Sequence, residues 1–323
     1  MYKLTIILAI VFFTGTNINA QVKSDTLIKK LDSLSYKNDS IGGQKNNIEP
    51  AAYNEQTKLT GKTYFTLLWS SIKQEYTKPF HTTKKEWLKF GLFAGGVAAL
   101  TTVDEPIQKA ALKLRNNSPT VANVGRYITN AGGTNELITL SAIGLYGFAT
   151  KNTKIKTTTF LASQAYITSA LIESTLKFFF GRTRPSFYDP TEEAEPKFLG
   201  PFGKTSRDFS GARSNSSFPS GHATAAFAAA TVYAMEFRNT KWVPILSYSA
   251  ASLIALSRIT ENKHWTTDIL VGSVLGYFSG RHIVDNYHRY AKIKAPQQAK
   301  NSVTFEMHYN IDHIEPGITW KFR

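Results

Sequence analysis

Three short blocks of polar residues interrupt otherwise apolar stretches of the sequence. They are Lys177–Pro185 (KFFFGRTRP), Pro219–His222 (PSGH) and Ser257–Asp268 (SRITENKHWTTD). Together they supply fixed cations, a hydroxyl donor, two imidazoles and a carboxylate. This set suits the binding and transfer of a phosphoryl group, because the charge of such a group lies on oxygens that cations and N–H groups can hold.

The predicted phosphate ligands come from all three blocks. Lys177, Arg184 and Arg258 are permanent cations, and the planar fork of arginine matches phosphate oxygens in pairs. Ser220 adds a hydroxyl donor, and Gly221 permits close approach of the backbone to an oxyanion. Because an apolar run follows these two residues, we expect a helix to begin here, and the free N–H groups of a helix N-terminus favour anions.

Two histidines and an aspartate are the predicted catalytic residues. His264 and Asp268 are four residues apart, which places them on one face of a helix if that helix starts early enough. A carboxylate at one imidazole nitrogen fixes the tautomer and stabilises the cation that forms. The other nitrogen of His264 is then free to attack phosphorus and form a phosphohistidine. His222 can protonate the leaving oxygen and later activate water.

Each of these residues alone is more often a packing or surface residue than a functional one. Eleven fixed residues in three ordered blocks are different, since they would arise by chance on the order of once in ten million chains of this length. Carboxylates are too few near the blocks to form a metal cage, so we predict no metal and no cofactor. Arg182 lies inside the first block at an unfixed position, and we expect it at the mouth of the site.

The three blocks, Lys-x6-Arg-Pro, Pro-Ser-Gly-His and Ser-Arg-x5-His-x3-Asp, resemble the signature motifs of the type 2 phosphatidic acid phosphatase superfamily. That superfamily includes lipid phosphate phosphatases, undecaprenyl-diphosphate phosphatases, bacterial non-specific acid phosphatases and vanadium-dependent haloperoxidases. The resemblance covers roughly residues 88–290. It implies an all-α six-helix bundle without a metal in the phosphatases. It also implies His264 as nucleophile, Asp268 as its partner and His222 as general acid.

Composition restricts the partners further. The formal net charge is +15, and 42% of the residues are hydrophobic. A basic balance suits anionic partners such as phosphates, anionic lipids or nucleic acid. The lysines are spread along the chain and do not form one stripe, so nucleic-acid binding is not predicted. The sequence has no cysteine, which excludes disulfides and thiolate zinc sites.

The first 87 residues lie outside the motif region. Residues 1–20 have the form of a signal peptide, because Lys3 and a short apolar run precede the small residue Ala20. An N-terminal anchor that stays attached is the alternative. Residues 21–87 form a polar extension, flexible up to about residue 60. Within it, Tyr64–Tyr76 predicts an amphipathic helix that lies on a membrane or docks on the core.

Six apolar segments rich in small residues predict closely packed helices. They are Trp87–Val103, Glu136–Thr150, Thr157–Phe180, Ser220–Phe237, Val243–Ser257 and Thr267–Val284. Most are shorter or more polar than the roughly 20 apolar residues of an ideal membrane span. The sequence therefore predicts a phosphatase bundle at residues 88–290 and leaves spanning, peripheral and soluble arrangements open.

Basic residues in three connecting regions predict an orientation. They are Lys151, Lys154, Lys156, Arg238, Lys241, Arg289, Lys292 and Lys294. In a spanning bundle they share one side, and positive loops favour the cytoplasm, so the site would face the periplasm. An exported N-terminus conflicts with this if every segment crosses. Either Trp87–Val103 does not cross, or the bundle is peripheral or soluble, or the N-terminal run is not a signal.

The tail, residues 291–323, changes to a two-residue period. Alternating apolar residues from Val303 to Ile311, and again after Pro316-Gly317, predict a β-hairpin. The whole pattern favours a phosphatase acting on an envelope lipid phosphate or diphosphate. A soluble exported non-specific acid phosphatase is the alternative, and a vanadium-dependent haloperoxidase is a weaker one. A polyprenyl diphosphate, a phosphoglyceride and a phosphorylated glycolipid all fit as substrates.

Overall fold

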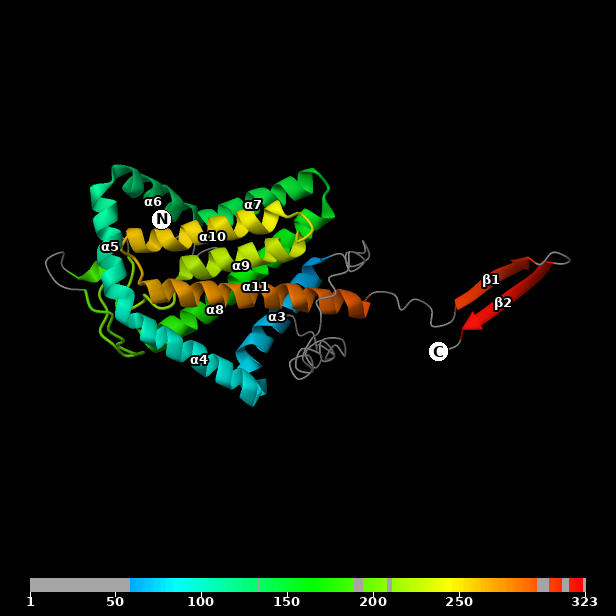
Figure 1. The fold of residues 1–323 in the computed structure, drawn as a ribbon, viewed down its shortest axis with the longest axis horizontal. Coiled ribbons are helices and arrows are strands. Elements are labelled where there is room, and N and C mark those ends of the chain that lie inside the picture. Colours follow the sequence, from blue (N-terminus) through cyan, green and yellow to red (C-terminus); the bar gives the residue numbers. More distant parts are fainter. Residues whose placement is uncertain are drawn as a thin grey trace, which may run out of the picture.

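The computed structural model describes residues 59–132, 134–188, 194–207, 211–294, 302–309 and 314–321. The predicted signal segment and the polar residues up to 58 lie outside the described residues. Within these ranges the chain forms a bundle of α-helices (Figure 1), with a two-stranded hairpin as its only sheet. The prediction of an all-α bundle is confirmed.

Each of the six apolar segments forms a helix. These helices are α4 (Lys84–Leu100), α7 (Thr134–Ala149), α8 (Thr153–Phe180), α9 (Gly221–Glu236), α10 (Trp242–Thr260) and α11 (Thr266–Lys294). The predicted amphipathic segment forms α3 (Gly61–Thr77), which the short helix η2 (Lys78–His81) follows. The Tyr64 hydroxyl is 2.9 Å from Ser163 Oγ on α8, so α3 docks on the bundle.

Two further helices, α5 (Asp104–Asn117) and α6 (Pro119–Ala131), were not predicted. They follow the short helix η3 (Thr101–Val103) and pack against α10. Both have favourable starts. Asp104 and Glu105 lie in the first turn of α5, where negative charge interacts well with the helix dipole. Ser118 accepts the N–H of Val121 at the start of α6, and Pro119 occupies its first position.

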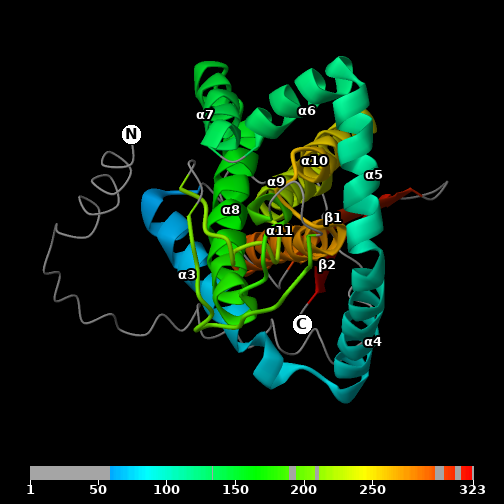
Figure 2. The same ribbon diagram turned by 90° about the vertical axis from the view of Figure 1, so that its left-hand side faces the viewer.

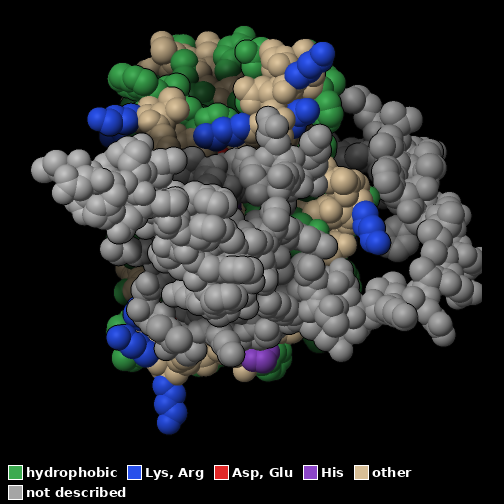
Figure 3. All heavy atoms as spheres, turned by 90° about the vertical axis from the view of Figure 1, so that its right-hand side faces the viewer, with side chains coloured by type: hydrophobic (Ala, Val, Ile, Leu, Met, Phe, Trp, Pro, Cys, Tyr) green, Lys and Arg blue, Asp and Glu red, His purple; other side chains and the backbone are tan. Residues whose placement is uncertain are grey.

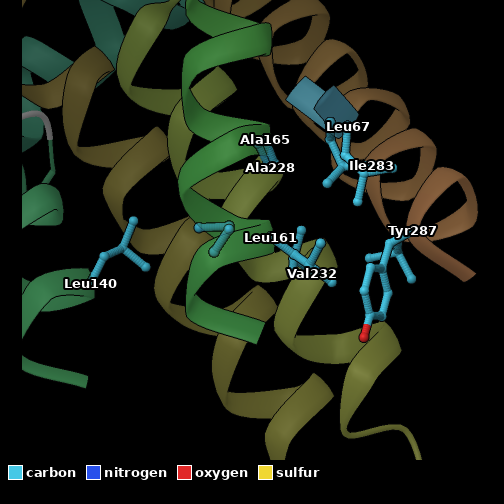
Figure 4. Packing of buried hydrophobic residues seen from close by; sticks show 11 residues of the cluster. Leu67, Leu140, Leu161, Ala165, Ala228, Val232, Ile283 and Tyr287 are labelled. Carbon is cyan, nitrogen blue, oxygen red and sulfur yellow. The ribbon is translucent and has the colours of Figure 1, made fainter. Parts of the chain in front are cut away.

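The core lies where α8, α9 and α11 meet. Figure 4 shows Leu161 of α8, Val232 of α9 and Ile283 of α11 in one cluster of buried side chains, with Leu67 of α3 at its edge. Alanine dominates the buried positions of α9. Such small side chains allow neighbouring helices to approach closely.

Three glycines of α11, spaced four residues apart, face α9. A Cβ added at Gly272 would lie 2.6 Å from the carbonyl oxygen of Ser220. At Gly276 it would lie 2.2 Å from that of Thr224, and at Gly280 it would lie 2.5 Å from that of Ala228. Any larger side chain must therefore push α9 and α11 apart.

We expect Gly276→Ala to lower the free energy of unfolding by about 1–3 kcal/mol, the usual cost of overpacking a core. Gly91→Ala is the matched control, because a Cβ at Gly91 on α4 meets no atom within 4 Å. That change should be neutral or stabilise by up to about 1 kcal/mol, since alanine is the better helix former. Thermal unfolding of both variants in detergent measures the difference, and equal melting temperatures would contradict the close packing.

The helix ends define two opposite ends of the bundle. Figure 2 looks onto the end where α9 and α11 begin and α8 ends, with the connection from α8 to α9 in front. Figure 3 faces the opposite end, where blue Lys and Arg side chains lie around the visible surface. The turns that carry Lys151 and Arg238 lie away from the first end, because α8 and α9 each run the length of the bundle between them.

Large apolar side chains are exposed on several helices. Helix α4 has no buried residue, and Phe90 is 59% exposed there. On α10, Trp242 is 71% exposed and Leu246 is 64% exposed. In the part of the chain that is described, α10 alone is long and apolar enough to cross a membrane, and only 28% of its most apolar window is buried.

The tail contains the predicted pair of strands. β1 (Ser302–Tyr309) and β2 (Ile314–Lys321) pair antiparallel, with Val303 opposite Trp320. Pro316 lies within β2, opposite Met307. The proline and the following glycine thus belong to a strand, and the connection between the strands comes before them.

Candidate active site

The three polar blocks meet at the end of the bundle shown in Figure 2. The main-chain N–H of Ser220 donates to the carbonyl oxygen of Asp268 (2.9 Å), which joins the second block to the third. Arg184 Nη1 lies 3.3 Å from His264 Nε2, which joins the first block to the third. Residues that are up to 91 positions apart, from Lys177 to Asp268, therefore share one region.

Local structure places each block. Helix α8 ends at Gly181, which has a φ of 55° and donates its N–H to the Lys177 carbonyl. Glycine suits this left-handed conformation, and the chain then turns so that Arg184 enters the site. Ser220 is the N-cap of α9, as predicted. Asp268 lies in the first turn of α11 and accepts the N–H of Trp265 (2.9 Å), which is half of a capping box.

His264 is buried and held from two sides. Its Nδ1 lies 2.8 Å from the carbonyl oxygen of Ser217, so Nδ1 carries the hydrogen and donates it. Its Nε2 lies 3.3 Å from Arg184 Nη1, which can only donate. The lone pair of Nε2 thus points to the cationic side of the site, where a phosphate would bind.

Asp268 differs in detail from the predicted direct partner of His264. Its Oδ2 is 3.5 Å from His264 Nδ1, which allows attraction between charges and is long for a hydrogen bond. The same oxygen accepts the hydroxyl of Ser217 at 2.5 Å. The carbonyl of Ser217 therefore fixes the tautomer of His264, and Asp268 supplies negative charge behind the ring.

The cations of the site differ in the hydrogen-bond and ion-pair partners that the protein gives them. Arg184 donates to the carbonyl oxygens of Ser216 (3.0 Å) and Lys263 (3.1 Å). Lys177 forms an ion pair with Glu173 one turn earlier on α8. Arg258 is buried, and its Nε has no hydrogen-bond partner among the described residues. A buried cation of this kind is costly without an anion.

His222 and Gly221 line a cavity of about 260 Å³ between α8 and α9, together with Tyr166 and Glu173. A Cβ at Gly221 would lie 2.7 Å from Glu173 Oε1 and 3.5 Å from Lys177 Nζ. Gly221 therefore lets α9 begin directly beside these charged groups. His222 therefore lies beside a cavity that is also lined by Glu173, the ion-pair partner of Lys177.

Both histidines are neutral at pH 7. Burial, with the nearby Arg184, Arg258 and Lys177, holds the pKa of His264 well below its usual value. Burial, followed by Arg258, lowers the pKa of His222 to about 3. Burial raises the pKa of Asp268, and Arg182, Ser217 and the Trp265 N–H oppose that rise. A neutral His264 has the lone pair that a nucleophile needs.

An anion in the site should return a proton to His222. Negative charge next to Arg258 and Lys177 cancels the repulsion that helps to lower the pKa of His222. The pKa of His222 then rises from about 3, while the larger effect of burial remains, so binding takes up a proton at about pH 4. We expect calorimetry in buffers of different ionisation enthalpy to show proton uptake with sulfate, whose own charge stays constant in this range. His222→Asn should abolish most of it, and binding without uptake by the wild type would contradict this electrostatic account.

Several residues of the site were missed or misplaced by the sequence reasoning. Arg182, expected at the mouth, is fully buried and donates to Asp268 and Asp104. It cannot reach the entrance because both carboxylates hold it inside. Asp104 belongs to α5 and lies far from every motif in the sequence. No sequence pattern indicates that it belongs to the site. Glu173 lies one helical turn before Lys177, and this spacing was the one available sign of their ion pair.

A comparison with protein families matches the part of the chain that carries these residues. The sequence profile of the PAP2 superfamily matches residues 158–291, the segment that contains all three blocks. This part of the chain, about two fifths of its length, thus matches the PAP2 superfamily. The matched segment includes most of α8, all of α9 and α10 and most of α11. Helices α3 to α7 precede it.

Proteins similar to this chain include a curated relative and two solved structures. Lipid A 1-phosphatase of Porphyromonas gingivalis is 40% identical over 65 residues, which are 20% of this chain and 15% of that relative. This chain thus matches a small part of that protein's length. The transmembrane PAP2 type phosphatidylglycerolphosphate phosphatase of Bacillus subtilis has a TM-score of 0.45 and 24% identity, covering 65% of this chain and 96% of that one. LpxE of Aquifex aeolicus has a TM-score of 0.43 and 20% identity, covering 56% and 94%.

Proposed function

We propose that this protein is a phosphatase that removes phosphate from an envelope lipid phosphate or diphosphate through a phosphohistidine on His264. The single observation that carries the proposal is the position of His264 Nε2, 3.3 Å from Arg184 and with Nδ1 fixed on Ser217. A neutral imidazole with its lone pair directed at a cationic pocket is arranged for attack on phosphorus.

The reaction has two steps. The lone pair of His264 Nε2 forms a bond to phosphorus, and the P–O bond to the lipid breaks. His222, which is protonated in the complex with the anionic substrate, gives this proton to the leaving oxygen and becomes neutral. His222 then takes a proton from water, which attacks phosphorus. The N–P bond breaks, the electron pair of this bond returns to His264 Nε2, and inorganic phosphate leaves. Asp268 stabilises the positive charge on the phosphorylated ring.

The phosphate ligands hold the oxygens that do not react. Arg258, Lys177 and Arg184 neutralise the charge of the transferring group, and the N-terminus of α9 at Ser220 and Gly221 adds N–H donors. When substrate binds, the ammonium group of Lys177 must contact both Glu173 and a phosphate oxygen. Glu173 therefore lies where it can restrict which phosphate groups enter.

Exposed apolar side chains support a lipid substrate. Helices α4 and α10 present Phe90, Trp242 and Leu246 outward, and a large exposed apolar surface is typical of contact with a membrane. The matching relative is named for dephosphorylating lipid A at its 1-position. We infer that the substrate is a membrane lipid whose phosphate reaches the end of the bundle from the bilayer.

We further propose that the protein is associated with the membrane of the cell envelope and that its site faces the periplasm. The support is the separation of the basic turns with Lys151 and Arg238 from the site, together with the preference of positive loops for the cytoplasm. The N-terminal run, as a signal peptide, would direct export, which agrees with this orientation if α4 does not cross the membrane.

A phosphate-release panel tests this function. The purified full chain in detergent is offered a polyprenyl diphosphate, a phosphatidic acid, a phosphorylated glycolipid and a soluble aromatic phosphate, with His264→Ala beside the wild type. We expect turnover of at least one lipid and little of the soluble ester. Preference for the soluble ester would instead support a non-specific acid phosphatase, and no His264-dependent release from any substrate would overturn the proposal.

A further inference from the structure

A chain of buried charges runs behind the nucleophile. Arg182 donates from Nη1 to Asp268 Oδ1 (2.6 Å) and from Nη2 to Asp104 Oδ2 (2.6 Å). All three side chains have no exposed surface. Asp268 in turn lies 3.5 Å from Nδ1 of His264. The order in space is thus Asp104, Arg182, Asp268, His264.

Asp104 also holds the start of α11. Its Oδ1 accepts the main-chain N–H of Thr267 (2.9 Å), and its Oδ2 accepts the hydroxyl of Thr267 (2.5 Å). That hydroxyl also accepts a hydrogen bond from Arg182 Nη1 (2.6 Å). One carboxylate therefore satisfies a free N–H at the N-terminus of α11 and fixes both the arginine and the turn next to Asp268.

We propose that Asp104 is a positioning residue for the nucleophile, acting through Arg182 and Thr267 on Asp268. Asp104 belongs to α5 and lies outside the matched residues 158–291, so the site is incomplete without a helix that precedes the family segment. The inference rests on the proposed function, since it assigns a role in the reaction of His264.

Electrostatics gives Asp104 a role beyond packing. Arg182 alone would neutralise Asp268, and Asp268 could then do little for a positive ring on His264. With Asp104 the buried group of two carboxylates and one guanidinium keeps a net charge of −1. Inside the protein, where charge is weakly screened, this charge favours the phosphorylated, cationic ring of His264. It has little effect on the ground state, where the ring is neutral.

The geometry adds a second reason. An aspartate at 104 offers only acceptors, and the facing groups, Arg182 Nη2, the Thr267 N–H and the Thr267 hydroxyl, are all donors. An asparagine would place an NH₂ group against one of them. Arg182 would then shift toward Asp268, and the turn that carries His264 and Asp268 would lose its fixed position.

The test compares Asp104→Asn with Glu236→Gln in the full chain. Glu236 is an equally buried carboxylate, ion-paired with His288 at 2.8 Å, and lies about 20 Å along α9 from Gly221. Both variants exchange a buried carboxylate for an amide, and both should lower the melting temperature. Activity on the lipid substrate, inorganic phosphate affinity and inhibition by orthovanadate are then measured for each.

For Asp104→Asn we expect kcat to fall about tenfold to hundredfold, as for other residues that orient a reacting group, with KM changed little. Orthovanadate resembles the five-coordinate transition state and should bind weaker by a similar factor, while phosphate affinity stays near that of the wild type. Glu236→Gln should leave all three unchanged. Asp104→Asn with wild-type kcat, or with equal losses for vanadate and phosphate, would overturn the inference. A wild type without His264-dependent turnover would instead overturn the proposed function and the inference with it.

Discussion

Replacing His264 with alanine is expected to reduce phosphate release by a factor of at least about 10⁴, because the group that bonds to phosphorus is lost and not merely displaced. His222, the other histidine of the site, is assigned to proton transfer in the proposed reaction and does not bond to phosphorus. Initial rates with saturating lipid substrate, measured over hours for the variant, give the factor.

Two controls make this result specific. His81→Ala removes an exposed histidine of η2 and should leave kcat unchanged. Sulfate binding by His264→Ala reports whether the cationic pocket is still formed, because Arg258 and Lys177 remain. An active His264→Ala enzyme that also binds sulfate would exclude a phosphohistidine at this position.

Arg258→Gln is expected to lower kcat/KM about 10²- to 10³-fold, the usual loss when one group that holds transition-state charge is removed. The same change should leave the melting temperature equal or higher. Arg258 is buried, Arg184 repels it more than Glu261 attracts it, and its Nε lacks a hydrogen-bond partner in the described structure. Removing a charge of this kind relieves a cost that the free protein bears for function.

The matched control for this prediction is Arg126→Gln. Arg126 is an exposed arginine of α6, the helix that packs against α10. The Arg126→Gln substitution removes the same charge from the surface, and it should change neither kcat/KM nor the melting temperature by much. A strongly destabilised Arg258→Gln would show that Arg258 holds the fold together, and the account of it as a phosphate ligand would then lose its support.

The bundle and the reacting groups were predictable because both depend on local sequence. The apolar segment around Ala228, for example, has a length and composition that only a buried helix explains. Ser220 could be placed at a helix start because its hydroxyl precedes an apolar run. The spacing of four brought His264 and Asp268 together, but His264 precedes α11, which begins at Thr266, and its Nδ1 lies 3.5 Å from Asp268.

The groups that support the site were not predictable for a physical reason. Asp104 contacts Thr267 across 163 positions of the sequence. Nothing in the sequence distinguishes Arg182 from a surface arginine, because its two carboxylate partners, Asp104 and Asp268, are distant in the chain. The carbonyl of Ser217, which holds His264 Nδ1, belongs to the backbone and leaves no residue-type signal. Helices α5 and α6 escaped prediction because α5 is largely polar and α6 is short.

The central claim is that His264 becomes covalently phosphorylated during turnover. Rapid quenching of the wild type with lipid substrate into alkali, where phosphohistidine survives, followed by mass spectrometry of the peptides, tests it directly. The account predicts a phosphoryl group on the peptide that contains His264 and on no other, absent in His264→Ala. A turning-over enzyme with the label on another residue, or with no label under conditions that trap phosphohistidine, would contradict it.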